Sequence, residues 1–275
     1  MDPLTGLLAE KMGFEAGYLG GGALGYVKTG LEANLSLTQL AQTGAEIAAA
    51  TQLPLILDAN CGWGNAMNMH HTRAVSEAAG FAAIELEDQI LPRRAHHHIG
   101  IEHMIPAESM VDNIREAVAA RCDADFVIIA RTNACRSEGI DEAIRRAKMY
   151  REAGADMLFV LQKDSADLCP IGEAVGDVPL LCAVTSGLEA LNMSLNELSE
   201  LGYRLVMDGA SSMLAAHKAV RESFAAFQAW ERDPSVGDDY AGETDRVHQL
   251  LNLKRLLDIE HRTVEKDCAR DHLLG

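Results

Sequence analysis

Two short acidic segments carry the residue types best suited to bind a divalent cation. One reads Asp-Ala-Asn-Cys-Gly-Trp-Gly-Asn over residues 58–65, and the other reads Ile-Glu-Leu-Glu-Asp-Gln over residues 84–89. Each comes at the end of a short apolar run, residues 55–57 in the first case and 81–84 in the second. Such a run, stopped by an acid, is typical of a buried parallel strand that ends in a loop. Carboxylates at such strand ends favour a hard ion such as Mg²⁺.

A polar, histidine-rich loop is expected over about residues 91–106, directly after the second acidic segment. One of its three consecutive histidines at 96–98 could act as a general acid or base, because imidazole titrates near a pH of about 6.5. A solvated loop and a transition-metal site are the alternatives, but three consecutive histidines rarely point toward one metal. Of the adjacent Arg93 and Arg94, we favour one as a clamp for a substrate carboxylate over two solvated charges.

Each of these acids also has a purely structural explanation. Asp58 could cap a helix or stabilise a loop, although its motif favours a metal ligand. Glu87 and Asp88 could pair with Arg131, and only one of the two needs to reach a metal. The flanking side chains are given structural roles. Trp63 is expected to form a wall of the pocket, Cys61 and Cys135 to be buried inert thiols, and His70 and His71 to lie on a helix surface or to pack rather than to bind a ligand.

Composition limits the classes of partner. The chain has 275 residues, and its 24 basic and 41 acidic side chains give a net charge of −17. This charge argues against nucleic acid and anionic membranes, whereas a bound metal and a few arginines could still attract a small anionic substrate. No apolar run is long enough to cross a membrane, and the N-terminus shows no export signal, so we expect a cytoplasmic protein. The six cysteines form no Cys-x-x-Cys pair and are expected to be reduced.

Strand and helix patterns alternate along the chain with short connections, which predicts parallel β/α units. A (β/α)₈ TIM barrel of about 250 residues fits this length better than an open doubly wound sheet, and a dinucleotide-binding glycine fingerprint is missing. The segment before Leu4 cannot supply a first strand, so that strand is expected upstream of residue 1 or the barrel is incomplete there. Seven strand candidates are centred on Tyr18, Leu55, Ile84, Val127, Leu158, Leu181 and Val206.

The C-terminal part is expected to lie outside the barrel. We predict a catalytic barrel domain over residues 1–232, followed by a linker and helical extension over 233–275. An apolar stripe predicts one helix over 244–266, and a helix that outlasts the barrel must bury its stripe elsewhere. A neighbouring subunit is a suitable place, so we expect a homo-oligomer, a dimer or tetramer, in which these helices could be exchanged.

The acidic segments resemble the isocitrate lyase and phosphoenolpyruvate mutase superfamily, including its carboxyphosphonoenolpyruvate mutase and methylisocitrate lyase branches. Residues 58–65 are similar to its Asp-Ala-Asp-Thr-Gly-Tyr-Gly-Asn motif, and 84–89 to its Ile-Glu-Asp-Gln strand end. Residues 130–134, Ala-Arg-Thr-Asn-Ala, and the helix pattern after them are similar to its Arg-Thr-Asp-Ala segment. The resemblance covers the chain from residue 4 to about 230.

The resemblance implies a TIM barrel that binds Mg²⁺, with Mn²⁺ as the alternative, together with a small 2-oxo acid. Members break or form a C–C or P–C bond through a pyruvate-like enolate. By resemblance, Asp58 binds the metal directly, while Asn60 and Glu87 hold its waters or complete its shell. Arg131 would lie beside a substrate carboxylate or the enolate oxygen. Backbone N–H groups near Gly20, Gly21 and Gly22 would bind the carboxylate.

Departures from the superfamily pattern bear on the reaction. Asn60 replaces the second Asp of the motif, which removes a negative charge and should weaken Mg²⁺ binding. The lyase branch has Lys-Lys-Cys-Gly-His where this chain has Arg-Arg-Ala-His-His over residues 93–97, and Ala95 cannot replace the Cys that protonates the leaving carbanion. His97, aligned with the superfamily His, is our candidate for that role. Gly20 replaces a serine and Ala183 an asparagine, while Gln89, where the phosphonate branch has Lys, favours C–C chemistry.

These residues predict a Mg²⁺-dependent lyase that cleaves a C–C bond in a small 2-hydroxy or 2-oxo di- or tricarboxylate. Arg131, His97, Arg94 and Glu87 are the predicted catalytic residues. The loop over 91–106 is expected to close over the substrate and exclude water. The alternatives are an oxaloacetate-type decarboxylase, a phosphonate mutase or hydrolase, and a catalytically silent paralogue, for which Asn60 and Ala95 argue.

Overall fold

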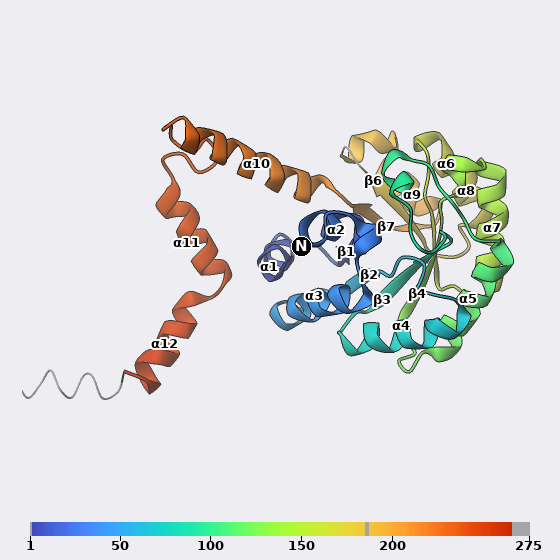
Figure 1. Ribbon diagram of the computed structural model, residues 1–275, viewed down its shortest axis with the longest axis horizontal. Helices are drawn as coiled ribbons and strands as arrows, with labels where there is room; N and C mark the ends of the chain where they lie inside the picture. The colour runs from blue at the N-terminus through green and yellow to red at the C-terminus, as the bar shows by residue number, and fades with distance from the viewer. Residues whose placement is uncertain (1, 185–186, 266–275) are drawn as a thin grey trace, which may run out of the picture.

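The computed structural model describes residues 2–184 and 187–265, and its centre is one sheet of seven parallel strands. The strands follow one another in chain order, β1 to β7, and each pairs with the next. Helices on the outer side connect them, so the sheet curves into a nearly closed barrel (Figure 1). The strands are β1 (Gly17–Leu19), β2 (Leu55–Asp58), β3 (Ala83–Glu87), β4 (Val127–Thr132), β5 (Met157–Val160), β6 (Leu180–Val184) and β7 (Tyr203–Asp208).

The α-helices lie before, between and after these strands. Within the described residues they are α1 (Pro3–Lys11), α2 (Gly21–Lys28), α3 (Leu37–Ala50), α4 (Ala66–Ala78), α5 (Ala107–Ala120), α6 (Ala134–Ser137), α7 (Ile140–Glu152), α8 (Leu168–Val175), α9 (Leu195–Glu200), α10 (Ser211–Gln228), α11 (Tyr240–Leu250) and α12 (Leu253–Thr263). The short 3₁₀ helices are η1 (Glu32–Asn34), η2 (Ala95–Ile99), η3 (Ser165–Asp167) and η4 (Leu188–Leu191).

Each strand has one face toward the helices and one toward the barrel interior, because side chains alternate along a strand. On β3, Ile84 packs in the large core between sheet and helices, whereas Ala83 belongs to the smaller interior cluster with Ile129 and Phe159. Positions 85 and 87 have the parity of Ala83. Two glutamates therefore project into the barrel from one strand.

The predicted α/β barrel is confirmed, and all seven strand candidates form strands. In the described part of the chain there are seven strands rather than eight, and β1 and β7 form the two edges of the sheet. The expected strand upstream of residue 1 remains a prediction. Capping boxes begin two of the outer helices, since Ser36 caps α3 and Ser194 caps α9.

The glycine-rich segment after β1 forms a helix, although glycine-rich segments usually form loops. Gly20 is the N-cap of α2, and glycines 21, 22 and 25 lie inside this helix. A Cβ at Gly25 would lie 2.3 Å from the backbone nitrogen of Glu32. Gly21 and Gly25 are needed because η1 packs closely against α2 at these two positions, which outweighs their poor helix propensity.

The expectation of a single helix over 244–266 is wrong over the described residues. Two helices, α11 and α12, form instead, because Asn252 adopts a left-handed conformation with φ of 53° between them. Residue 266 and Cys268 lie outside the described residues. The other five cysteines are free thiols. The division into domains at residue 232 remains a prediction.

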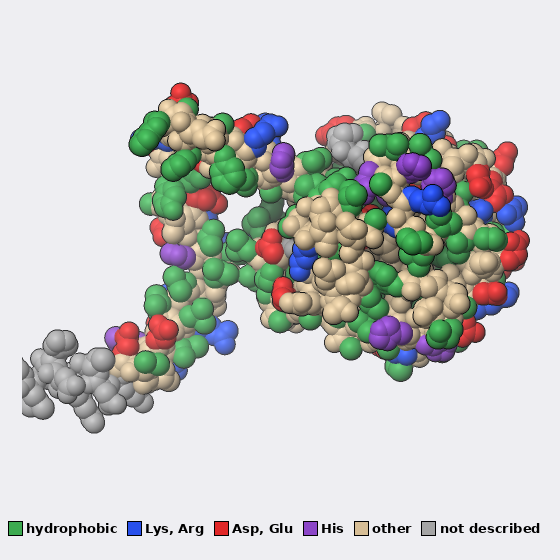
Figure 2. Space-filling view, viewed as in Figure 1, with side chains coloured by type: hydrophobic (Ala, Val, Ile, Leu, Met, Phe, Trp, Pro, Cys, Tyr) green, Lys and Arg blue, Asp and Glu red, His purple; other side chains and the backbone are tan. Residues whose placement is uncertain are grey.

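Helices α10 to α12 extend away from the barrel on one side, and α11 returns to contact α1 (Figure 1). Figure 2 shows many apolar side chains along this extension, and they include Phe224, Phe227, Trp230 and Leu257. Trp230 is 97% exposed, and Leu251 and Leu257 of the predicted stripe are 46% and 53% exposed, so these apolar side chains remain largely unburied within one chain. None of the helices in the described segments is both long and apolar enough to span a membrane.

Candidate active site

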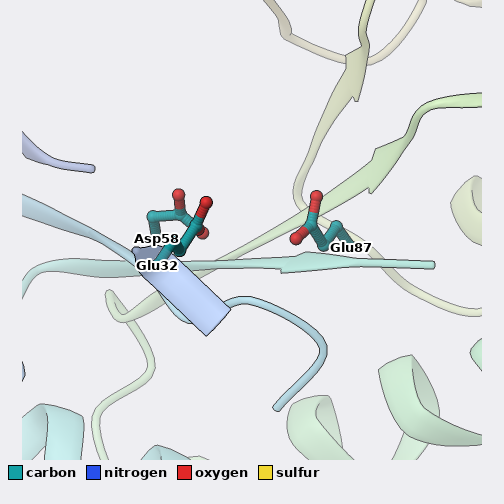
Figure 3. Close-up of side chains that lie close together, drawn as sticks. All are labelled: Glu32, Asp58 and Glu87. Carbon is teal, nitrogen blue, oxygen red and sulfur yellow. The ribbon is translucent and has the colours of Figure 1, made fainter. Parts of the chain in front are cut away.

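Three carboxylates from separate parts of the chain meet at the C-terminal end of the barrel strands. Asp58 ends β2, Glu87 ends β3, and Glu32 comes from η1. One oxygen of each lies within 4.8 Å of the others, and Figure 3 shows the Glu32 and Asp58 carboxyl groups side by side with Glu87 across from them. All three are buried, with at most 4% of each residue exposed. Because three buried acids cannot remain charged without a positive partner, this carboxylate trio requires one.

Backbone amides fix the orientation of Asp58. The Gly21 N–H donates to Oδ2 at 3.0 Å, and the Asn60 N–H donates to Oδ1 at 3.1 Å. Since Gly21 is the first residue of α2, the carboxylate also benefits from the positive end of that helix. Asp58 thus has the structural role that we considered as the alternative, and its geometry is also compatible with a ligand.

Arg93 provides one positive partner for the trio. Its Nη1 lies 2.9 Å from Oε1 of Glu32 and also contacts Oε1 of Glu87 and Oδ1 of Asn60. Burial, and next the charge of Asp58, raise the pKa of Glu32 to about 8 despite this contact. Burial also opposes ionisation of Glu87, but Arg93 and Arg131 outweigh it and lower the pKa of Glu87 to about 2.

Arg131, at the end of β4, is held from several sides. Its Nη1 donates to Oε1 of Glu85 at 2.8 Å, and its Nε donates to Oδ1 of Asn133 at 2.9 Å. The same Nε lies 3.4 Å from Oε2 of Glu87, and the guanidinium carbon lies 5.0 Å from the centre of the Phe159 ring. These contacts fix a permanent positive charge beside the trio, inside the barrel.

Glu85 lies one layer deeper, on the same face of β3 as Glu87. It accepts hydrogen bonds from Arg131 and from the Tyr18 hydroxyl, the latter at 2.7 Å. Burial raises its pKa to about 7, although Arg131 lowers it. Asp88 has a different role, because its Oδ2 accepts hydrogen bonds from Tyr150 at 2.8 Å and from Arg146 at 3.2 Å. Of Glu87 and Asp88, the two acids considered as metal ligands, only Glu87 therefore lies close to Glu32 and Asp58.

The histidine-rich loop divides its charged residues between the interior and the surface. Arg93 is buried, whereas its neighbour Arg94 is exposed. His97 is half-buried, and its Nδ1 lies 2.8 Å from Oε2 of Glu102. The same Nδ1 also lies 2.8 Å from Nε2 of Gln89, so Glu102 and Gln89 together fix the orientation of the ring. His96 faces His103 instead, with 3.0 Å between their ring nitrogens.

The structure brings together Asp58, Asn60, Glu87 and Arg131 among the predicted site residues. Trp63 lies against the core, and its indole N–H donates to the Leu35 carbonyl at 3.3 Å. Of the predicted glycines, Gly21 touches Asp58 through its N–H. The substrate-binding roles of Trp63 and the three glycines, and the catalytic roles of Arg94 and His97, remain predictions.

Sequence reasoning missed Glu32 and did not identify Arg93 as the partner of the trio. Glu32 is a single acid between apolar residues in the stretch 31–35, and it lies far from both acidic segments in sequence. Its only signal is the glycine-rich stretch before it, which allows η1 to pack on α2.

The donor set of the trio fits a hard divalent cation. Glu32, Asp58 and Glu87 offer only carboxylate oxygens, and the side-chain oxygen of Asn60 lies beside them. Mg²⁺ and Mn²⁺ prefer such oxygen ligands to nitrogen or sulfur. Arg93 and Arg131 offset part of the negative charge of these carboxylates, and a bound cation would offset more of it.

The packing of α2 on Glu32 gives a first prediction. Gly25→Ala places a Cβ 2.3 Å from the Glu32 backbone, so η1 must move, and we expect a loss of about 1–3 kcal/mol in stability. Displacement of Glu32 should raise the Kd for Mn²⁺ about tenfold or more, which corresponds to a loss of about 1.4 kcal/mol or more in binding free energy. Titration calorimetry and urea denaturation measure the two effects.

Gly22→Ala is the matched control, because it lies in the same helix and its Cβ would approach Glu32 only to 3.7 Å. Both variants gain the same helix propensity. Equal Mn²⁺ affinity in the two variants would contradict the proposed dependence of the site on close packing between α2 and η1.

Comparison with known proteins shows that the relatives of this chain are enzymes. The family model for phosphoenolpyruvate phosphomutase matches residues 1–228. The chain is 33% identical to 2,3-dimethylmalate lyase of Eubacterium barkeri, over 94% of this chain and 90% of that protein. It is 38% identical to oxaloacetate decarboxylase 1 of Pseudomonas fluorescens, over 81% and 76%.

A solved structure agrees with these relatives. Phosphonopyruvate hydrolase in complex with oxalate and Mg²⁺ superimposes with a TM-score of 0.81 at 29% identity, covering 96% of this chain and 92% of that one. The relatives are thus carbon–carbon lyases, decarboxylases and carbon–phosphorus hydrolases.

Proposed function

Because the chain belongs to the phosphoenolpyruvate mutase/isocitrate lyase superfamily, we propose that it is a divalent-cation-dependent carbon–carbon lyase. Its substrate is a small 2-hydroxy or 2-oxo di- or tricarboxylate, which is cleaved through a pyruvate-like enolate. The observation that supports this most is the buried trio of Glu32, Asp58 and Glu87 beside Arg131. The Mg²⁺ and oxalate in the phosphonopyruvate hydrolase complex are consistent with such a site.

Glu32, Asp58 and Glu87 would hold Mg²⁺ or Mn²⁺, with Asn60 at the edge of the site. When bound, the cation supplies positive charge that stabilises an enolate next to a carboxylate. The residues of the chain add to this effect. Arg131 is fixed by Glu85 and Asn133, so it can stabilise negative charge on the substrate without reorganising.

A proton must reach the carbanion that bond cleavage leaves behind. Ala95 cannot provide it, and we assign this step to His97, which Glu102 orients through Nδ1. Arg94 is the proposed carboxylate clamp and would have to turn inward from its exposed position when substrate binds. Closure of the loop would exclude water from the enolate.

The role of His97 gives a second prediction. His97→Gln is expected to lower kcat about 10²-fold, the lower range for loss of a general acid. Mn²⁺ affinity should change far less than kcat, because His97 contacts none of the three carboxylates. Stopped-flow measurement of product formation tests this. Full activity in His97→Gln would remove His97 as the proton donor and leave the cation site intact.

An oxaloacetate-type decarboxylase is the second candidate. It is favoured by Ala95, because decarboxylation needs no cysteine acid, and by the 38% identity to an oxaloacetate decarboxylase. A phosphonate mutase or hydrolase is third, since Gln89 stands where that branch has Lys. The alternative without catalytic activity is a silent paralogue, for which Asn60 and Ala95 argue.

One assay separates these candidates. The protein is incubated with a panel of 2-oxo and 2-hydroxy acids and phosphonopyruvate, with Mg²⁺, with Mn²⁺ or with chelator. Pyruvate with a second carboxylic or oxo acid indicates a lyase, CO₂ a decarboxylase, and inorganic phosphate a phosphonate hydrolase. We expect C–C cleavage that stops in chelator. No product from any substrate, together with no metal binding, would favour the silent paralogue.

We also propose a homo-oligomer, in which a second copy covers surfaces that one chain leaves open. A cavity of about 460 Å³ lies between α1 and strands β1 and β7, and its lining is largely apolar. Helix α10 starts directly after β7 but leaves the barrel, so this seam stays uncovered. The exposed apolar side chains of α10 in another copy are complementary to it.

This assembly gives a third prediction. In light scattering, the wild type should have a mass of two or four times 29.7 kDa. Phe227→Glu should shift it to the monomer, because this side chain is 84% exposed in a single chain and a buried charge would oppose association. Gln228→Glu, one residue further, is the control and should keep the oligomer. A monomeric wild type would contradict the proposal.

A further inference from the structure

The Arg93 side chain lies where a cation held by the trio would have to lie. Its Nη1 contacts an oxygen of Glu32, of Glu87 and of Asn60, and the side chain is only 4% exposed. These are three of the oxygen donors that we assign to a divalent cation. The positively charged Nη1 group of Arg93 therefore already contacts the oxygens that would bind the cation.

We propose that Arg93 is a built-in competitor of the divalent cation, and that binding of the cation expels Arg93 and moves its loop. This inference rests on the proposed function, because it needs a cation at the trio. A divalent ion would lie about 2.0–2.6 Å from the same oxygens. Two positive groups cannot share these oxygens at such distances, since both sterics and charge repulsion oppose it.

The inserted position of Arg93 is incompletely satisfied. Within the described residues, its Nε is buried and has no hydrogen-bond partner. A buried donor without a partner is destabilising, because its bonds to water are lost and not replaced. Arg93 therefore occupies the site with one unsatisfied N–H group, which can bind water again once the side chain moves out into solvent.

Expulsion of Arg93 would move a defined part of the loop. An isolated bridge between Gln89 and Met104 and the bond from the Ile90 N–H to the His103 carbonyl, 2.8 Å long, close the base of the loop. The segment between these anchors contains η2 and His97. Cation binding is thereby coupled to the position of the proposed proton donor.

Mn²⁺ binding to the full chain tests the competition. Arg93→Met removes the competing charge, so we expect Mn²⁺ to bind at least ten times more tightly than to the wild type in titration calorimetry. Arg94→Met is the matched control. It has the same change in the same loop, but Arg94 is exposed, and its Mn²⁺ affinity should equal that of the wild type.

Hydrogen exchange gives a second test, which uses only the wild-type protein and therefore does not require a variant to fold. Saturating Mn²⁺ should speed exchange over residues 92–101, where the amides of His97 and Ile101 donate within the loop. Unchanged exchange in Mn²⁺-saturated protein, or Arg93→Met affinity equal to or weaker than the wild type, would overturn the competition alone. No Mn²⁺ binding by either protein would overturn the cation site and the proposed function with it.

Discussion

Asp58→Asn is expected to abolish divalent-cation binding and to lower kcat/KM by about 10³-fold or more, as loss of charge stabilisation at a reacting centre does. The substitution keeps the size of the side chain but removes its charge. An amide also offers one oxygen in place of two, so it cannot accept from the N–H groups of both Gly21 and Asn60. Calorimetry with Mn²⁺ and the rate of product formation measure the two losses.

Asp112→Asn is the matched control for this prediction, because it is the same chemical change at an exposed position on α5. It should leave both metal affinity and turnover unchanged. Retention of wild-type Mn²⁺ affinity in Asp58→Asn would refute the assignment of the trio, since no other member is held so firmly by backbone amides. Loss of turnover with full metal affinity would instead place Asp58 in substrate binding.

The strand-end members of the site could be predicted from sequence because they follow from local pattern. An apolar run that ends in an acid locates Asp58 and Glu87, and neighbouring parallel strands bring their C-terminal ends to the same edge. Arg131 is paired in register with Glu87 for the same reason. Side-chain alternation then decides which acids face inward, so Glu87 reaches the interior and Asp88 does not.

Glu32 and Arg93 could not be predicted because their positions depend on packing between distant segments. Glu32 reaches the trio only because α2 carries glycine where η1 crosses it. Arg93 and Arg94 are adjacent and chemically identical, and only the path of the loop decides which one is buried. Likewise, the apolar stripe over 244–266 is continuous in sequence, and the break at Asn252 is a backbone choice that periodicity does not reveal.

Arg131→Met is expected to damage stability and catalysis together. The substitution leaves Glu85 and Glu87 with a lost partner in the barrel interior, where breaking a buried ion pair costs about 3–5 kcal/mol. It also removes the fixed positive charge proposed to stabilise the enolate, and kcat should fall about 10²–10³-fold. Urea denaturation and turnover at saturating substrate separate the two effects.

The double variant Arg131→Met with Glu85→Gln distinguishes the structural from the catalytic role of the arginine. Removing the Glu85 charge should restore part of the lost stability. Glu87 is then the one charged carboxylate that has lost its contact with Arg131, and Arg93 still pairs with it. Turnover should not recover, since the stabilising charge is still missing. If turnover recovers in step with stability, Arg131 acts by holding the barrel together, and negative charge on the substrate must be stabilised by other groups.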